Sequence, residues 1–487
     1  MKKVIYSLVA GAMMLASCSD FTDITQKGKN LLASTDDLEL LLNESKGIWS
    51  NDMRACTGVI YAYSSVSSQV AQANKSRMAI LYSFDESQME RFEQLTTSDS
   101  YYSDIYGYIG KVANPILTQL DAASGTDADK KALKAEALTL RAFSHYLLVQ
   151  KYAKAYSSSA ASDPAIVLLT EDVDIQTPQP KATVQEVYDQ CLKDINEAIA
   201  LNAMPETAAS IYRMNKASMY AVKAHICLGM QDYTGAIEAA NQALALNNKL
   251  YDYWANASET YSYGGSPYYV SGVSCNENPE TYFAMVNSVY YTWVNPEITK
   301  RFEDGYATFS LEDSMMKMYQ GISAVMPSYA VYEQYNAILG LTGWSDGYDF
   351  DHYSNDSGLC TPMMYLVQAE AYLQSGNIGA AMGALDMLRA KRIQENNYHG
   401  YQGVITTKAA AIEAFKATYL AENIWTQTWN YFGFKRWNAY GADWQETLSQ
   451  TIGGQTYSIA PTSQFWVFPF PTNVSSKNPN LTWNKAQ

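Results

Sequence analysis

Two stretches of the chain share one spacing of small and apolar residues, and this internal repeat constrains the fold more than any other feature. In residues 217–246 and again in residues 363–392, such residues recur at relative positions 0, 3, 9, 12, 16 and 19. Small residues at these positions let two antiparallel helices approach closely, and Gly229 or Gly376 would open the turn between them. The spacing is that of the tetratricopeptide repeat and predicts stacked pairs of helices. The matching residues are Ala224, Cys227, Tyr233, Ala236, Ala240 and Ala243 in the first stretch, and Ala369, Tyr372, Ile378, Ala381, Leu385 and Leu388 in the second.

Helical periodicity elsewhere predicts further units of the same kind. Residues 130–151 and 184–201 carry apolar residues at three- and four-residue steps, and so do residues 409–438. Serines and prolines interrupt residues 155–183, which we expect to form a long connection. The predicted fold class is mainly α, with about four tetratricopeptide-like helical pairs near 130–201, 217–246, 363–392 and 409–438.

Residues 248–362 do not fit this helical scaffold. They are rich in Tyr, Gly, Ser, Asn and Asp, show little periodicity, and are too long for a simple loop. We predict that this insertion, together with residues 50–110, forms a loop-rich binding face, and that residues 50–100 are loops and short helices on a surface. The aromatic segment 465–471 cannot be helical beyond Pro469, so we expect it to pack across the body in an extended form.

The aromatic composition points to ligand contact, whereas the charge argues against nucleic acid. The chain has 39 tyrosines and 10 tryptophans but only 14 phenylalanines. Tyrosine offers an apolar face and a hydroxyl, which suits half-exposed positions, although about half of these residues are explained as core filler. The formal charge of −15 and the lack of a run of basic residues exclude a phosphate-binding footprint.

The first residues predict export and lipid attachment. Lys2 and Lys3 precede a short apolar run, and Leu15-Ala16-Ser17-Cys18 resembles the cleavage motif of bacterial lipoproteins. Residues 1–17 would be the signal peptide, Cys18 the lipidation site, residues 18–33 a tether and residues 34–487 a single domain. An ordinary secretory signal is the alternative. No later stretch is apolar for long enough to span a bilayer.

The residues that usually carry chemistry form no motif in this chain. Neither GxSxG, HExxH nor a Walker sequence is present, and the four histidines are scattered. The five cysteines after Cys18 have no CxxC spacing, which predicts neither a zinc nor a redox site and leaves one disulfide open. Four aspartates between 346 and 356 miss the EF-hand pattern, so a solvated loop is favoured over a calcium site. We expect no metal and no cofactor.

Five blocks of sequence, taken together, resemble the SusD/RagB family of nutrient-binding surface lipoproteins of Bacteroidetes. They are residues 18–29, 102–114, 136–146, 368–373 with 388–392, and 434–437 with 468–484. Two places depart from the family pattern: Tyr102 stands where a tryptophan is usual, and residues 419–425 differ from the common helix near the C-terminus. The first departure matters, because an aromatic near this place contributes to sugar binding in the founding member.

The resemblance implies a protein without enzymatic activity on the outer face of the outer membrane. It would bind an oligo- or polysaccharide and act as a lid on a partner TonB-dependent, SusC-like transporter. Sugar rings stack on Tyr or Trp while their hydroxyls need polar partners, and a shallow arc of this kind gives about micromolar to millimolar affinity. The expected stacking residues are Tyr101, Tyr102, Trp254, Tyr268, Tyr290, Trp293 and Trp344, with Arg77 and Asn287 as polar partners.

Two other classes of function stay open at this point. A surface glycoside hydrolase would need two carboxylates about 5–9 Å apart, and acidic pairs such as Glu277 with Glu280 or Glu303 with Asp304 exist. A tetratricopeptide scaffold for protein interaction, or a peptide-binding relative, is the other alternative. The sequence does not name the glycan, nor does it decide between a glycan and a peptide or glycoprotein cargo.

Overall fold

The computed structural model describes residues 32–44, 47, 51–57, 60–62, 76–256, 258–263, 266–270, 277–289, 292–294, 298, 300–307, 347–348, 352–355, 357–424, 426–452 and 455–486. Cys18, Tyr290 and Trp344 lie outside the described residues, and so does most of the aspartate run near residue 350.

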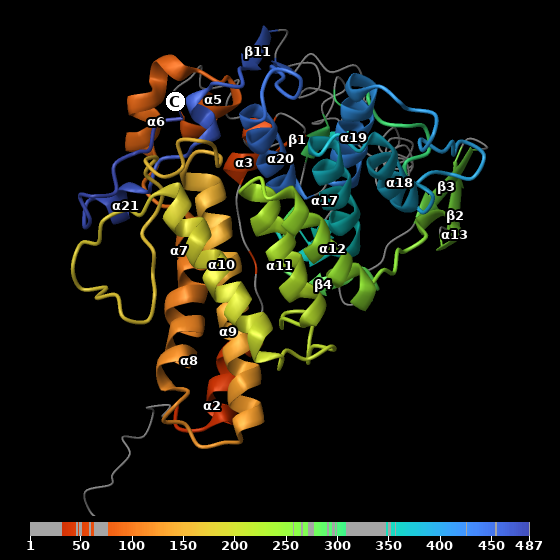
Figure 1. The fold of residues 1–487 in the computed structure, drawn as a ribbon. Helices are drawn as coiled ribbons and strands as arrows, with labels where there is room; N and C mark the ends of the chain where they lie inside the picture. The colour runs from red at the N-terminus through yellow and green to blue at the C-terminus, as the bar shows by residue number, and fades with distance from the viewer. Residues whose placement is uncertain are drawn as a thin grey trace, which may run out of the picture.

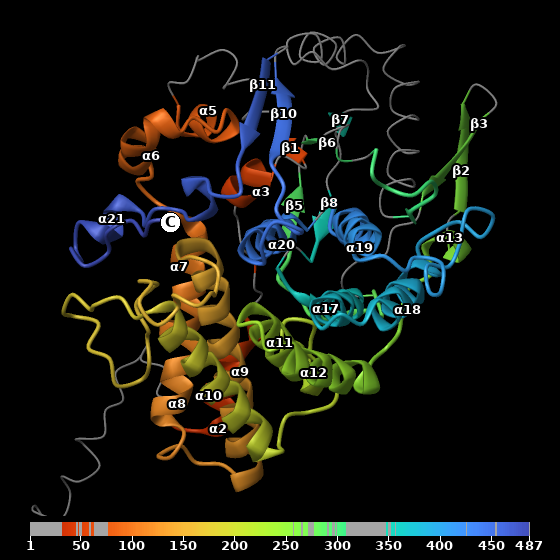
Figure 2. The ribbon, with the colours of Figure 1, turned by 45° about the horizontal axis from the view of Figure 1, so that its top comes forward.

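Four helical pairs form the body of the molecule, and the predicted fold class is confirmed. The helices of the first three pairs pack side by side, and α19 and α20 contact through aromatic side chains. Between pairs, α12 packs against α17, and α19 packs against both α17 and α18. The stack runs through the molecule from one side to the other (Figures 1 and 2). The pairs are α9 (Asp127–Tyr152) with α10 (Val184–Leu201), α11 (Lys216–Gly229) with α12 (Tyr233–Leu246), α17 (Thr361–Gln374) with α18 (Ile378–Arg389), and α19 (Lys408–Glu422) with α20 (Gln427–Ala439).

The turns inside the two repeat units are equivalent, but the glycine prediction is wrong for the first unit. Gly376 takes a φ of +77° between α17 and α18, whereas the residue in the same place between α11 and α12 is Gln231, with a φ of +64°. Gly229 is the last residue of α11. Its role is close packing, because a Cβ there would lie 2.7 Å from the hydroxyl of Tyr188 on α10.

Short helices precede the stack. They are α2 (Thr35–Leu40), η1 (Leu41–Asn43), α3 (Asn51–Thr57), α5 (Arg77–Tyr82), η2 (Glu86–Gln88), α6 (Met89–Leu95), α7 (Ser100–Gly107), η3 (Tyr108–Ala113) and α8 (Asn114–Gln119). Short helices were predicted over 50–100, but a surface location is wrong for α5, in which Ala79, Ile80, Leu81 and Tyr82 have no exposed surface.

The turn of π-helix η3 lies inside the continuous run from α7 to α8. The Asn114 N–H donates to the Ile109 carbonyl, five residues earlier, and Pro115 follows without an N–H of its own. After this wider turn, the Asn114 side chain contacts two segments that are distant in sequence. Its Oδ1 accepts from Arg141 on α9 and its Nδ2 donates to the Leu169 carbonyl.

The described part of residues 248–362 contains short antiparallel strands that the aperiodic sequence did not predict. The pairs are β2 (Ser258–Tyr263) with β3 (Ser266–Val270), β4 (Thr281–Phe283) with β9 (Leu359–Cys360), and β5 (Asn287–Val289) with β8 (His352–Ser354). A further sheet joins β6 (Thr292–Val294) to β1 (Ile60–Ala62) on one side and β7 (Gly347–Tyr348) on the other. The insertion thus meets residues 60–62 through backbone pairing.

The C-terminal segment packs across the body as predicted. Phe465, Trp466, Phe468 and Phe470 are buried, and the Phe468 N–H donates to the carbonyl of Lys151 at the end of α9. The segment includes η6 (Gln464–Trp466) and leads into α21 (Thr472–Ser475). It follows the hairpin of β10 (Leu448–Ile452) and β11 (Gln455–Ile459), which lies at the end of the molecule opposite α2 (Figure 1).

Candidate functional site

The aromatic segment around Trp254 is the part of the predicted binding face that the structure describes best. Trp254 lies in α13 (Tyr253–Asn256), close to the β2–β3 hairpin and α18 (Figure 2). Its side chain is half-buried, and its indole N–H donates to the carbonyls of Gly305, at 2.8 Å, and Arg392, at 3.0 Å. The ring is therefore held in one orientation by two backbone acceptors. Tyr251 and Tyr253 precede it, with ring centroids 5.0 Å apart.

A buried ionic cluster supports this segment. The Arg392 guanidinium has no exposed surface, donates to both oxygens of Glu422 at 2.8 and 2.9 Å, and donates to Glu280 at 2.7 Å. It also donates to the Tyr251 carbonyl and lies 4.9 Å from the centre of the Tyr253 ring. The Arg392 guanidinium thus connects Glu422 at the end of α19, Glu280 next to β4, and the aromatic segment 251–254.

This cluster contains two carboxylates, Glu280 and Glu422, but only one guanidinium, that of Arg392. Burial raises the pKa of Glu280, and Arg392 opposes that shift. Burial acts to lower the pKa of Arg392, but Glu280 and Glu422 raise it well above its usual value. The Tyr306 hydroxyl donates to Glu422 at 3.0 Å and so stabilises its carboxylate.

A second arginine, Arg389, is the last residue of α18 and binds neighbouring loops in the same way. Arg389 donates to Glu303 at 2.8 and 2.5 Å and to Asp386 at 2.6 Å, and its guanidinium carbon lies 3.2 Å from the centre of the Tyr401 ring. Both arginines belong to the block 388–392 that resembles the SusD/RagB family. No role was predicted for this block from the sequence, because Arg389 ends α18 and Arg392 lies in the turn after it, where no helical spacing indicates a shared partner.

Arg77 is committed to an ion pair. Its two terminal nitrogens donate to the two Asp52 oxygens at 2.6 and 2.7 Å, and its Nε donates to Thr96. Burial opposes ionisation of Asp52, but Arg77 and Lys151 hold the pKa of that carboxyl well below its usual range. The predicted role of Arg77 as a sugar partner is therefore not supported by its contacts, which tie α5 to α3.

The adjacent residues Tyr101 and Tyr102 have different surroundings. Tyr101 has no exposed surface, and its hydroxyl donates to the Leu147 carbonyl at 2.8 Å. The prediction of a stacking role for Tyr101 is wrong, because a ring without exposed surface cannot receive a sugar. Tyr102 is half-buried and packs on Tyr106, with a centroid distance of 4.6 Å, and on Phe470. Burial raises the pKa of Tyr102 to about 12.

For three predicted residues the structure describes the backbone alone. In the strand registers, Tyr268 lies opposite Tyr261, Asn287 opposite Ser354, and Trp293 opposite Tyr61. Their roles as ligand contacts stay predictions, as do those of Tyr290 and Trp344.

The buried histidines and cysteines belong to the core. His225 stacks on Trp429 with ring centroids 4.3 Å apart, and burial lowers the pKa of His145 and of His225 to about 3. Cys56, Cys191 and Cys227 are buried free thiols. Among the described residues, no group of His, Cys, Asp or Glu is placed to hold a metal ion.

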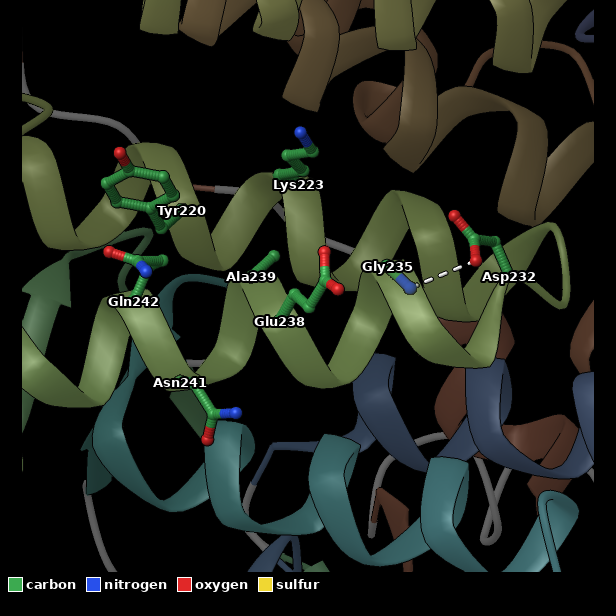
Figure 3. Close-up of a pocket in the computed structure, with 8 residues that line it drawn as sticks. All are labelled: Tyr220, Lys223, Asp232, Gly235, Glu238, Ala239, Asn241 and Gln242. Atoms are coloured by element: carbon green, nitrogen blue, oxygen red, sulfur yellow. Dashed lines mark hydrogen bonds between the residues drawn. The ribbon is translucent and has the colours of Figure 1, made fainter.

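One surface hollow, of about 430 Å³, lies between α11 and α12 (Figure 3). It is lined by polar side chains and was not foreseen from the sequence. Within the described residues, no helix has both the length and the apolar character needed to cross a bilayer.

One family model matches part of the chain. Residues 25–228 match a SusD-like family described as "starch-binding associating with outer membrane". No curated protein matches the chain.

Solved structures of similar fold cover nearly the whole chain. A putative sugar-binding protein from Bacteroides vulgatus has a TM-score of 0.62 and 15% identity, covering 94% of this chain and 99% of its own. A SusD superfamily protein from Bacteroides thetaiotaomicron has a TM-score of 0.61 and 14% identity, covering 93% and 100%. A SusD-like carbohydrate-binding protein from Bacteroides vulgatus has a TM-score of 0.59 and 15% identity, covering 93% and 98%. These likenesses show a shared fold, and the match over residues 25–228 shows that the N-terminal part of the chain is similar to the SusD-like family.

Proposed function

We propose that this protein is a cell-surface lipoprotein that captures an oligo- or polysaccharide and delivers it to a SusC-like, TonB-dependent transporter in the outer membrane. The family match over residues 25–228, with its description as starch-binding, is the observation that carries the proposal. Cys18 would carry the lipid and hold the protein on the outer face of the membrane.

The geometry around Trp254 fits such a role. A half-buried indole, fixed by two backbone acceptors, offers a rigid apolar surface to the C–H face of a sugar ring. Tyr251 and Tyr253 extend the aromatic surface next to it. Since the Arg392 cluster holds this segment in place, little conformational freedom is lost on binding.

One carboxylate of each acidic pair considered for hydrolysis is used in an ion pair. Glu280 is buried and bonded to Arg392, and Glu303 is bonded to Arg389. A glycosidase needs a carboxylate that faces the substrate and can exchange a proton with it. The contacts of these two carboxylates therefore favour a binding function over hydrolysis.

Affinity electrophoresis in gels containing amylopectin, xylan, α-mannan, β-1,3-glucan, arabinan or galactan tests the proposal. A form that begins after Cys18 should be retarded by at least one polysaccharide without releasing reducing ends. The Trp254→Ala variant should bind about tenfold more weakly, a loss of about 1.4 kcal/mol. Trp483→Ala, a half-buried tryptophan whose indole also donates to a backbone carbonyl, is the matched control.

Delivery is tested separately by co-purification of the full chain with its transporter. Trp254→Ala should leave co-purification unchanged while reducing polysaccharide retention. Release of reducing ends by the wild type, or retention by none of the polysaccharides, would overturn glycan capture.

A further inference from the structure

The hollow between α11 and α12 has the size of a small-molecule site and a polar lining. Its volume of about 430 Å³ falls within the range of small-molecule sites, about 300–1,000 Å³. Figure 3 shows Tyr220 beside Gln242 and the Glu238 carboxylate pointing toward α11, while the Lys223 nitrogen points away from Glu238. Tyr220 and Lys223 come from α11, and Glu238 and Gln242 come from α12.

Four of the polar side chains around the hollow are available to a ligand. Tyr220, Lys223, Glu238 and Gln242 make no hydrogen bond or ion pair with any other residue that the structure describes. The remaining polar groups are occupied. Asn241 accepts from Gln368 at 2.6 Å, and Asp232 accepts from the Gly235 N–H at 3.0 Å.

The packing of the repeat does not require a carboxylate or an amide at two positions of the hollow. In the second unit, the positions of Glu238 and Gln242 are taken by Gly383 and Met387, whereas that of Tyr220 is again a tyrosine, the buried Tyr365. The second unit forms an equivalent helical pair without this acid and amide. Glu238 and Gln242 are therefore additional to what the scaffold needs.

The chemistry of the lining favours a neutral saccharide. Tyr220 offers a ring for stacking, Lys223 and Gln242 offer donors, and Glu238 and Gln242 offer acceptors, which together suit neighbouring hydroxyl groups. Asp232 and Glu238 outnumber Lys223, so a polyanionic glycan would be repelled. The core of a protein interface needs apolar side chains, and none of the large exposed ones in the described residues lines the hollow.

We propose that this hollow is a second contact site for a neutral saccharide chain, distinct from the aromatic segment at Trp254. The inference rests on the proposed function, because it concerns the same polysaccharide. Two weak contacts on one chain raise the avidity for long polymers, since binding at the first contact raises the local concentration at the second.

The test compares the Tyr220→Ala/Gln242→Ala variant with wild type in the six polysaccharide gels named above. With any polysaccharide that retards the wild type, the variant should bind about three- to tenfold more weakly. The control is Lys193→Ala/Asn196→Ala, which removes exposed polar residues from α10, and it should bind like wild type. Gln242→Ala alone, at an exposed position, gives the same test if the double variant does not fold.

The outcomes separate this inference from the proposed function. Equal retardation of wild type, the double variant and Gln242→Ala would overturn the second site and leave glycan capture intact. No retardation of the wild type would overturn both. Unchanged retardation with loss of transporter co-purification would show that the hollow contacts protein, and would also overturn the saccharide site.

Discussion

Lys391 and Arg392 are neighbours in sequence, but their charges contribute to the molecule in different ways. Arg392 has no exposed surface and joins two carboxylates, whereas Lys391 pairs with Asp252 at 3.0 Å with about half of its side chain exposed. Removing one partner from a buried ionic cluster leaves an uncompensated charge, while an exposed pair is screened by water. The free energy of unfolding should therefore depend strongly on Arg392 and weakly on Lys391.

We predict that Arg392→Met lowers the free energy of unfolding by about 3–5 kcal/mol. Lys391→Met should lower it by less than about 1 kcal/mol. Urea unfolding at pH 7, followed by tryptophan fluorescence, measures both. Adding Glu280→Gln and Glu422→Gln to Arg392→Met should recover part of the loss, because the unpaired carboxylates are then gone. Similar midpoints for Arg392→Met and Lys391→Met would contradict the role given to this cluster.

A second buried cation, Lys435, predicts a dependence of stability on pH. Its ammonium group contacts the carbonyls of Gln150 and Ala153 at the end of α9, but burial lowers its pKa from 10.5 to about 7. Between these pH values the unfolded state binds more protons than the folded state. The free energy of unfolding should therefore rise with pH in this window, at up to about 1.4 kcal/mol per pH unit.

Urea unfolding of wild type and Lys435→Met between pH 7.5 and 9 tests this expectation. The buried thiols oppose the trend near pH 9, since burial raises the pKa of Cys56, for example, above that of an unfolded cysteine. Both proteins keep these thiols, so the difference between their slopes reports Lys435. Parallel curves would show that the lysine keeps an ordinary pKa in the folded protein.

At the scale of elements, local patterns predicted the helices and missed the contacts between distant segments. The repeat spacing predicted the pairs α11–α12 and α17–α18, because small residues at fixed steps are a local signal. The Arg392–Glu280 contact joins residues 112 positions apart, and no local pattern shows that partner. The short strands of the insertion likewise depend on pairing with segments far away in sequence.

The candidate site was harder to predict for the same reason. Tyr101 and Tyr102 are the same residue type, so composition does not distinguish them. Successive residues of a helix point in directions about 100° apart. Tyr101 therefore lies in the core, whereas Tyr102 is half-buried. Trp254 was predicted from its aromatic surroundings alone. Its support by Arg392 and Gly305 became visible in the folded chain.

Packing between helical pairs gives a prediction at this scale. Gly229→Ala would place a methyl group 2.7 Å from the Tyr188 hydroxyl and 3.2 Å from the Tyr146 ring. Both rings are buried, so α10 and α11 would have to separate, at about 1–3 kcal/mol. Gly107→Ala is the matched control, because a Cβ there meets nothing within 4 Å and the backbone is helical. That change should be neutral or stabilise by about 0.5–1 kcal/mol. Thermal unfolding of both variants measures the difference, and equal effects would argue against tight packing at Gly229.

At the scale of the whole molecule, the two ends of the fold differ. The N-terminal helix α2 lies beside the turn between α8 and α9, where Ser34 and Ser124 form a backbone bridge. The β10–β11 hairpin and helices α5 and α6 lie at the far end (Figure 1). A lipid on Cys18 would therefore attach to the molecule at the α8–α9 end. Helix α13, which contains Trp254, lies away from α2 in both views (Figures 1 and 2).

This arrangement predicts that membrane attachment and folding are independent. Cys18→Ala should abolish incorporation of labelled palmitate and release the protein from the membrane fraction, because two or three acyl chains supply the stable anchoring. The released protein should keep the thermal midpoint and the polysaccharide retention of the lipidated form, since the described core is built from residue 38 onward. Added protease should degrade the wild type on intact cells if it faces the exterior.

The matched control is Ser17→Ala, which keeps a small residue before the cysteine and should be labelled like wild type. Labelling of Cys18→Ala, or an unlabelled wild type that stays in the membrane fraction, would contradict attachment through Cys18. Resistance to protease on intact cells, with full digestion after lysis, would place the protein on the inner side and so remove it from contact with external glycans. Because each readout changes independently, anchoring through residue 18, exposure on the cell surface and sugar binding can be tested separately.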